Sequence, residues 1–324
     1  LSISKYTANM VKFFAIPGTT GKVRLKVEKP ADSIGVMIRY KTTAWSSGDT
    51  KDTGTLLATI TDDSNYKDAN EWYEVSGLTD GTAYHFKAFP FSSEFYNETI
   101  GLNETVCKAG GLVLEYTMDS VSGSTLYDTG GSQNGTLSNI TFESQKIGNG
   151  AVLASTPSLT GTLATAIGTI KEANFWGAFN SSAYGYLFAL YTYSNFSLQN
   201  ATIGDPSSTD LSFGFTATTG GNVAGKKITI NKDTTLRNYS IVWGNNVLND
   251  ADFKAFINNV QQTLNDITTS GSTGTPANNN FTMFKRNTLA QNYLTNSKVD
   301  QIRFFSRELK TYERANLYNG GAGC

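Results

Sequence analysis

Hydrophobic and polar side chains alternate along the first third of the chain. In VRLKVEKP (23–30), Val23, Leu25 and Val27 lie on one face, with charged residues between them. The run TAYHFKAFPF (82–91) repeats this alternation. A period of two is typical of half-buried strands in an antiparallel sheet. This part of the chain therefore predicts short strands joined by turns.

Strand-sized runs continue after a glycine pair in CKAGG (107–111). Aromatic and aliphatic residues dominate five of them: 112–120, 171–180, 184–193, 210–221 and 237–246. Glycine pairs between strand patterns favour linkers. The chain therefore predicts an all-β protein of two domains, with an arm at 1–7, a first sandwich at 8–108, a linker at 109–111 and a second sandwich at 112–324.

Near the C-terminus, VDQIRFFSRELKTYERANLYNGG (299–321) passes from a strand pattern into a charged stretch. We expect a strand from Val299 to Phe305 and a short helix from Thr311 to Tyr318. Threonine is a good N-cap residue, so Thr311 is the expected cap.

The segment NDADFKAFINNVQQTLNDI (249–267) fits two structures. Its apolar residues recur at helical spacing, and Asp250 could cap such a helix. The same residues also fit a hairpin that turns at Asn258-Asn259. We favour the hairpin and keep the helix as the alternative.

Composition and charge narrow the classes of function. Of 324 residues, 39% are hydrophobic, 12% aromatic and only 16% charged, which is typical of turn-rich sandwiches. The net charge is −1 without runs of like charge, so neither nucleic acid nor an anionic membrane surface is an expected partner. No apolar run approaches the ~20 residues of a membrane span. The chain opens at Leu1 without an apolar signal core, so we expect a processed start or a piece of a longer protein.

The stretch GLTDGTAYHFKAF resembles the end of a fibronectin type III domain. Leu78, Gly81 and Tyr84 stand where that family has the residues of its tyrosine corner. The first third of the chain is more narrowly similar to type III modules in tail proteins of phages that infect Gram-positive bacteria. No tryptophan occupies the second core strand, which ends in Tyr40.

The second part resembles laminin-G-like, concanavalin A-like jelly-roll domains. At its start the matching residues are Asp119, Asp128, Asn134–Leu137 and Gly148–Leu153. At its end they are Asp300, Ile302, Arg303, Phe304, Arg307, Leu309, Glu313, Leu317 and Tyr318. This resemblance implies a two-sheet lectin-like sandwich closed by the C-terminal strand and helix.

Few residues are suited to catalysis. The single histidine, His85, lies on an alternating strand among solvent-facing positions, and no Gly-x-Ser-x-Gly elbow is present. The Glu-x-Asp-x-Glu strand of lectin-like glycosidases is also missing. Glu115 and Asp119 share one strand face, where a role at a sheet edge is expected. We therefore expect no enzymatic activity and no zinc site.

The jelly-roll resemblance implies calcium binding, for which Asp119, Asp128 and Asp300 are the candidate ligands. The alternative, which we favour, is that these aspartates form turns.

For sugar binding, aromatic rings with nearby amides are the expected platform. The candidates are Trp176, Tyr184, Tyr186 and Asn180, although the period of two places most of the aromatics here in the core.

The cysteines Cys107 and Cys324 flank the second domain. Because the ends of such jelly rolls lie close together, the resemblance implies a disulfide that closes the domain. Two free thiols, expected in a reducing cytosol, are the alternative.

Together the resemblances imply a non-enzymatic adhesion protein of a virion, such as a phage tail fibre. Its expected location is the virion surface or the extracellular space. Expected partners are host cell-surface polysaccharide, other virion proteins and further copies of the chain. One alternative is a virion decoration protein without ligand. The others are a carbohydrate-binding accessory module of a secreted bacterial or archaeal enzyme, and a glycosidase that uses unrecognised carboxylates.

Overall fold

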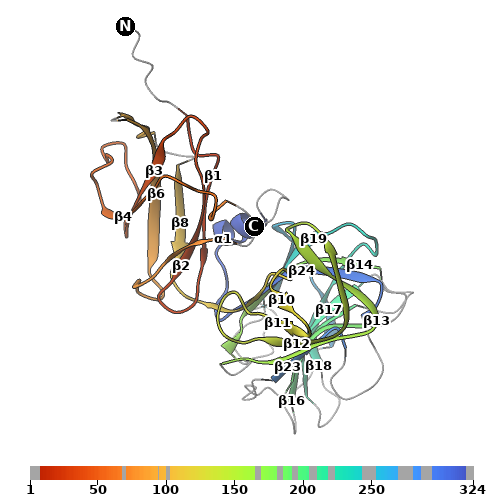
Figure 1. Ribbon diagram of the computed structural model, residues 1–324. Helices are drawn as coiled ribbons and strands as arrows, with labels where there is room; N and C mark the ends of the chain where they lie inside the picture. Colours follow the sequence, from red (N-terminus) through yellow and green to blue (C-terminus); the bar gives the residue numbers. More distant parts are fainter. Residues whose placement is uncertain are drawn as a thin grey trace. The chain divides into compact units, whose positions relative to one another are not determined.

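The computed structural model describes residues 8–67, 71–93, 95–99, 103–164, 169–180, 185–191, 196–203, 210–217, 223–242, 253–268, 280–285 and 294–318. Within these residues the protein is all-β, as predicted, with strands β1 to β24 and one helix, α1. It divides into two compact units, Leu1–Gly111 and Leu112–Cys324 (Figure 1).

The first unit is built from two antiparallel sheets. One sheet has the order β1-β2-β5, formed by Lys12–Pro17, Val23–Glu28 and Tyr73–Val75. The other has the order β4-β3-β6-β7, with β8 also on β6, formed by Thr55–Ile60, Gly35–Lys41, Ala83–Ser92, Phe95–Tyr96 and Glu104–Lys108. The predicted inward face of β2 packs against Ile38 and Phe86 of the other sheet.

A corner hydrogen bond closes the turn before β6. The backbone N–H of Thr79 donates to the hydroxyl of Tyr84 at 2.9 Å. Tyr84 is buried in the same core as Leu78. The Tyr84 side chain thus fixes the turn together with the backbone bond from the Thr82 N–H to the Thr79 carbonyl at 3.1 Å.

The outer face of the β6 sheet is less open than the alternation predicted. Lys87 is fully buried, and its Nζ donates to the carbonyl of Glu98 at 3.0 Å. Trp45 covers this face, packing edge-on against Phe89 at 5.8 Å between ring centroids. A loop folded back over the strand thus buries a position that alternation alone assigns to solvent.

The second unit is a sandwich of two strand layers. The first layer follows β21-β20-β19-β14-β24, with β9 on β24, formed by Val260–Gln261, Lys254–Ile257, Arg237–Val242, Glu172–Phe179, Ser297–Phe305 and Leu112–Tyr116. The second follows β12-β13-β23-β15-β16-β17-β18-β22, formed by Gly135–Ser144, Asn149–Thr162, Asn280–Met283, Gly185–Tyr191, Phe196–Ile203, Asp210–Ala217, Val223–Thr229 and Asn265–Thr268.

One long strand joins the two layers. β13 pairs with β24 through Ala151–Leu153 and with β23 through 159–162. Between these two parts, Thr156 has a φ of 52°. Phe188 of β15 meets Phe304 of β24 edge-on at 5.6 Å, so the core fills the space between the layers.

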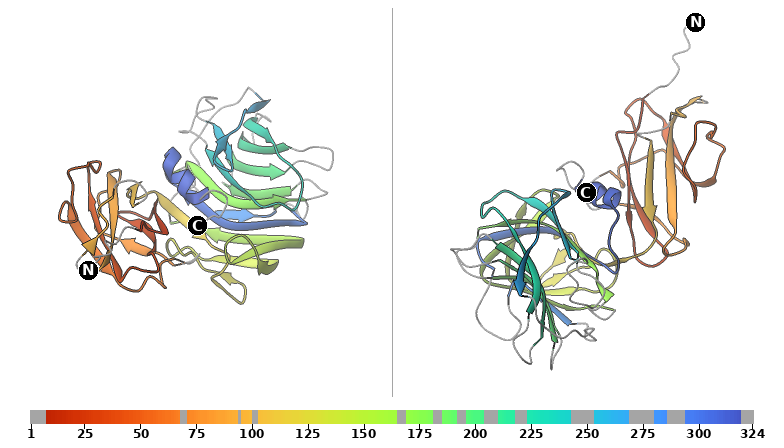
Figure 2. Two further views of the ribbon diagram at one scale, coloured as in Figure 1. Left: turned by 90° about the horizontal axis from the view of Figure 1, so that it is seen from above. Right: turned by 180° about the vertical axis from the view of Figure 1, so that it is seen from behind.

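The predicted C-terminal strand and helix are both present. β24 runs between β14 on one side and β9 with the start of β13 on the other, as the blue strand in Figure 2 shows. α1 spans Thr311–Tyr318. The cap prediction was wrong by one residue, because Arg314 N–H bonds to the Lys310 carbonyl and Glu313 accepts the Lys310 N–H at 2.8 Å. Lys310 is therefore the N-cap, and Glu313 bonds back to it as in a capping box.

The hairpin prediction at 249–267 is confirmed. β20 and β21 pair across Asn258-Asn259, whose φ angles are 51° and 63°. Asparagine tolerates this left-handed conformation better than most residues, and a type I′ hairpin turn requires it at both positions. α1 is the helix that the described residues contain, and none of them forms a helix able to cross a bilayer.

Candidate functional site

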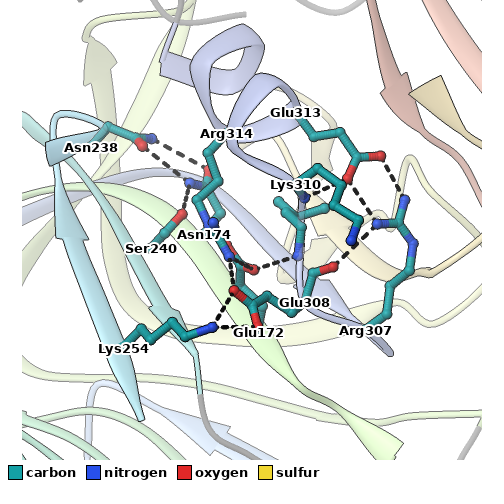
Figure 3. Close-up of polar contacts among 11 residues, drawn as sticks. Glu172, Asn174, Asn238, Ser240, Lys254, Arg307, Glu308, Lys310, Glu313 and Arg314 are labelled. Carbon is teal, nitrogen blue, oxygen red and sulfur yellow. Dashed lines mark hydrogen bonds and ion pairs between the residues drawn. The ribbon is translucent and has the colours of Figure 1, made fainter. Parts of the chain in front are cut away.

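Buried polar side chains cover the outer face of the first layer of the second unit. On β14, Phe175 and Phe179 point into the core, while Glu172, Asn174 and Trp176 occupy the opposite face. All three are buried, because α1 and its preceding loop lie over this face (Figure 3). The face is therefore a polar interface between sheet and helix.

An arginine on the helix pairs with a glutamate on the sheet. Arg314 donates from Nε and Nη2 to the two carboxylate oxygens of Glu172 at 2.8 and 2.9 Å. The N–H of Leu309 adds a bond of 2.7 Å to Glu172 Oε2. Burial lowers the pKa of Arg314, but the bonds and charges of Glu172 and Glu308 together outweigh this effect and raise the pKa above its ordinary value. This pair fixes α1 to β14.

Neighbouring contacts extend the interface, as Figure 3 shows. Asn174 donates from Nδ2 to Asn238 Oδ1 at 3.1 Å and to Ser240 Oγ at 2.7 Å. On the solvent side, Lys254 pairs with Glu308 at 2.9 Å. The amide and hydroxyl groups that could recognise a ligand are thus bonded to one another.

Trp176, the aromatic predicted to bind sugar, lies inside this interface. It is 1% exposed, and its ring stacks on Tyr318 of α1 with centroids 6.0 Å apart and an angle of 22°. Trp176 therefore packs between sheet and helix and does not form the exposed platform that the sequence predicted.

The other predicted sugar contacts are not gathered around Trp176. Asn180 follows β14 and is exposed. Tyr184 lies outside the described residues. Tyr186 belongs to β15, but its side chain is also outside the described part.

A second buried ion pair holds β9 to β24. Arg303 Nε donates to Glu115 Oε1 at 2.7 Å, and both side chains are fully buried. Arg303 Nη2 also donates to Gln301 Oε1 at 2.7 Å. Gln301 has a φ of 51° beside the register shift between β24 and β14, so a β-bulge brings its side chain to the arginine. Glu115 lies on an edge strand, as expected, and forms an internal ion pair there.

Asp128 organises its own loop. Its carboxylate accepts the N–H groups of Glu115, Gly130 and Gln133 at 2.9, 3.0 and 3.1 Å. Burial raises its pKa, although the three N–H groups stabilise the charged form. This geometry is that of an Asx-type turn former, the alternative that the sequence favoured.

Asp119 and Asp300 come together elsewhere in the unit. Asp300 accepts the Ile147 N–H at 3.1 Å, and Asp119 accepts the Asn149 N–H at 2.6 Å. Between these two donors, a Cβ on Gly148 would lie 2.3 Å from Asp119 Oδ1, and its φ is +70°, so the turn requires glycine. Burial raises the pKa of Asp300 to about 8; the Ile147 N–H opposes this rise and the nearby Asp119 adds to it.

Asp119 and Asp300 supply part of what a calcium site requires. Asp300 Oδ1 is buried and forms no hydrogen bond within the described part of the chain, which suits either a proton or a cation. Calcium takes six to eight oxygen ligands. Asp128 is bonded elsewhere, and the described residues contain no cluster of three or more acidic, histidine or cysteine side chains. Calcium at Asp119 and Asp300 therefore stays a prediction.

The histidine and the two cysteines are the remaining candidates. His85 is half-buried on β6, where burial lowers its pKa, while Glu104 opposes and Lys41 adds to this effect. Cys107 is buried in the first core, and Cys324 lies outside the described residues. The disulfide stays a prediction.

Comparison with known proteins gives distant similarity to several solved structures. No family model and no curated protein sequence matches the chain. Among solved structures, a Trypanosoma rangeli sialidase in complex with sialic acid is similar at 9% identity and a TM-score of 0.46, covering 76% of this chain and 44% of the sialidase. Domain 4 of AbnA, an extracellular GH43 arabinanase from Geobacillus stearothermophilus in complex with arabinotriose, is similar at 15% identity and a TM-score of 0.44, covering 66% and 98%.

The binding domain of botulinum neurotoxin serotype D/C is similar at 15% identity and a TM-score of 0.45, covering 64% of this chain and 52% of that one. The chain thus spans about half the length of the sialidase and neurotoxin structures. The protein is a two-unit all-β protein whose second unit is a β-sandwich closed by a polar helix interface.

Proposed function

We propose that this protein is a non-enzymatic adhesion protein. The second unit binds glycan on a host cell surface, and the first unit acts as a spacer of the fibronectin type III kind. The protein belongs to a virion surface structure such as a phage tail fibre. The proposal combines the two sequence resemblances with the way the structure uses its acidic residues.

The observation that carries the proposal is the bonding of four of the five buried carboxylates described in the second unit. The fifth, Asp300, is 0% exposed and so out of reach of a substrate. Glu115 and Glu172 are each bonded to a buried arginine. Glu313 accepts two bonds from Arg307, and Asp128 accepts three backbone N–H groups. A glycosidase requires one carboxyl group to donate a proton and another to act as base or nucleophile. Carboxylates held in structural pairs are poorly suited to that work, which favours binding over hydrolysis.

The first unit supports the spacer role. Its two sheets and the bond from Thr79 N–H to the Tyr84 hydroxyl agree with the type III resemblance. Leu78 and Tyr84 are buried together, so the residues that carry the resemblance also stabilise the unit.

The test is binding of the full chain to intact Gram-positive bacterial cells and to their purified wall polysaccharides, with and without calcium. Saturable binding without release of reducing ends supports the proposal. Release of reducing ends identifies a glycosidase instead. Assembly on virion proteins without any glycan binding identifies a decoration protein.

A further inference from the structure

An aromatic ring is presented to solvent at the end of β11 (Thr125–Leu126). Tyr127 is 42% exposed, whereas Trp176 and Tyr239 of the same unit are 1% exposed. Among the large hydrophobic side chains described in this unit, Val260 is the other exposed one. Single exposed apolar residues are common on surfaces, so the surroundings of Tyr127 decide its meaning.

The loop that carries Tyr127 is held rigidly. The Tyr127 N–H donates to the Ser120 carbonyl at 2.8 Å, and the next residue is the Asp128 that accepts three N–H groups. Gln133 anchors the far end, donating to the Val113 carbonyl at 2.8 Å and accepting the Ala164 N–H at 2.6 Å. A ligand that binds here would not have to order the loop, which lowers the cost of binding.

The segment that carries the ring is polar and nearly free of charge. In residues 120–142 the only charged residue is Asp128, and its side chain is buried. β10 (Val121–Ser122) pairs with β11, and β11 pairs with β12. Small polar residues are exposed on these two hairpins: Ser122, Ser124, Ser132, Asn134, Thr136 and Ser138. These strands lie together in Figure 1. Hydroxyl groups donate and accept, as sugar hydroxyls do.

An amide lies beside the tyrosine. Asn134 Oδ1 accepts the N–H of Asp128 at 3.2 Å, which fixes this side chain next to the residue that follows Tyr127. Asn134 is exposed, and its Nδ2 forms no hydrogen bond within the described residues. Two amide donors are therefore available to a ligand that contacts the ring.

We propose that Tyr127 and Asn134 form a binding site for the uncharged sugar residues of a polysaccharide. This inference rests on the proposed function and names its site and its class of ligand. The C–H face of a pyranose packs on the tyrosine ring, and the Asn134 amide donates to a sugar hydroxyl. The loop offers no arginine or lysine for phosphate or carboxylate, so the site selects neutral over anionic glycans.

The experiment compares full-length wild type with Tyr127→Ala, Tyr127→Phe and Asn134→Ala. The probes are immobilised neutral polysaccharides (dextran, mannan, galactan and the neutral fraction of a Gram-positive cell wall) and anionic wall teichoic acid. Phe95→Ala and Val260→Ala are the controls, since both residues are exposed and lie elsewhere. We expect wild type to bind a neutral probe, Tyr127→Ala to bind about tenfold more weakly or worse, and Tyr127→Phe to retain most binding. Asn134→Ala should lose about threefold to tenfold, and the controls should be unchanged.

A second measurement reports on the ring directly. Tyr127 should be nitrated by tetranitromethane in the free protein and protected at saturating neutral polysaccharide, as read by peptide mass spectrometry. Equal binding by wild type and Tyr127→Ala, or nitration unchanged by bound polysaccharide, overturns the site while the adhesion function stands. Binding to teichoic acid alone overturns the neutral-glycan assignment. Wild type that binds neither cells nor any polysaccharide overturns the proposed function itself.

Discussion

Arg314 and Glu172 lie 142 positions apart in the sequence and form a two-pronged ion pair, with bonds of 2.8 and 2.9 Å. The arginine side chain is 4% exposed and the glutamate 0%. Because both charges are out of water, each depends on the other for compensation. The helix α1 therefore stays on its sheet through a contact between charges as well as through apolar packing.

Removing one partner should be costly. We expect Arg314→Ala to lower the free energy of unfolding by about 3–5 kcal/mol, since it leaves Glu172 buried without its cation. Urea unfolding followed by tryptophan fluorescence measures this, because Trp176 lies under the same helix.

The matched control is Lys254→Ala, which breaks a more exposed pair with Glu308 and should cost about 0–1 kcal/mol. Equal effects of the two variants would show that burial does not govern the Arg314 pair. The double variant Glu172→Gln with Arg314→Met should recover part of the loss.

The pKa of Asp300 gives a pH dependence with a definite sign. Its folded-state pKa of about 8 lies above the unfolded value of 3.8, so protonation favours folding. The contribution is complete below about pH 4 and is lost as the pH rises toward 8. The total is on the order of 6 kcal/mol. The melting temperature should therefore fall more between pH 5.5 and pH 8.5 for wild type than for Asp300→Asn.

Asp233→Asn provides the comparison. Bonding to Arg237 lowers the pKa of Asp233 to about 2, so its contribution is lost only in acid. The melting temperature of the Asp233→Asn variant should therefore fall between pH 5.5 and 8.5 by as much as that of wild type. If calcium abolishes that decline in wild type and leaves Asp300→Asn unchanged, the carboxylate pair holds a cation at high pH.

Trp176 should behave as a structural residue. Trp176→Ala removes a fully packed ring between β14 and Tyr318, and we expect a loss of about 3–5 kcal/mol of stability. Asn180→Ala, at the exposed end of the same strand, should leave stability within about 0.5 kcal/mol. A Trp176→Ala protein with wild-type unfolding and lost glycan binding would contradict the packing role and restore the platform.

Tyr84→Phe tests the corner of the first unit. The substitution keeps the ring and removes the acceptor of the Thr79 N–H. A loss of about 0.5–1.5 kcal/mol is expected, measured as the unfolding transition of the first unit. Tyr66→Phe serves as a control, as its ring also packs against the first core. The same change in both variants would remove the special role of the corner bond.

Local patterns predicted the elements well. The run 299–305 is rich in β-branched and aromatic residues, and β24 contains it. The Asn258-Asn259 pair predicted its hairpin because asparagine tolerates the positive φ that both turn positions adopt. Burial of Val23, Leu25 and Val27 followed from their period of two.

The site depended on contacts that sequence spacing cannot show. Alternation places Trp176 on the same face of β14 as the polar residues Glu172 and Asn174. Only the position of α1, which the alternation does not predict, brings Tyr318 over its ring. Alternation assigns Lys87 to the solvent-facing side of β6, but Trp45 covers that side in the structure. Tyr127 gave a weak signal, as a tyrosine just before a turn aspartate in LYDTGG. In each case, distant residues determine whether a side chain is covered or exposed.

The central place of β24 has a consequence for biosynthesis. Its neighbours β9, β13 and β14 are all translated earlier, and each lacks this hydrogen-bonding partner until residues 297–305 have left the ribosome. During that interval the nascent sandwich has unpaired strand edges, which are prone to aggregate. The first unit has every strand of its sheets by residue 108 and can fold while the second is still being made. Emergence of residues 297–305, rather than early collapse, is thus the step that completes the sandwich.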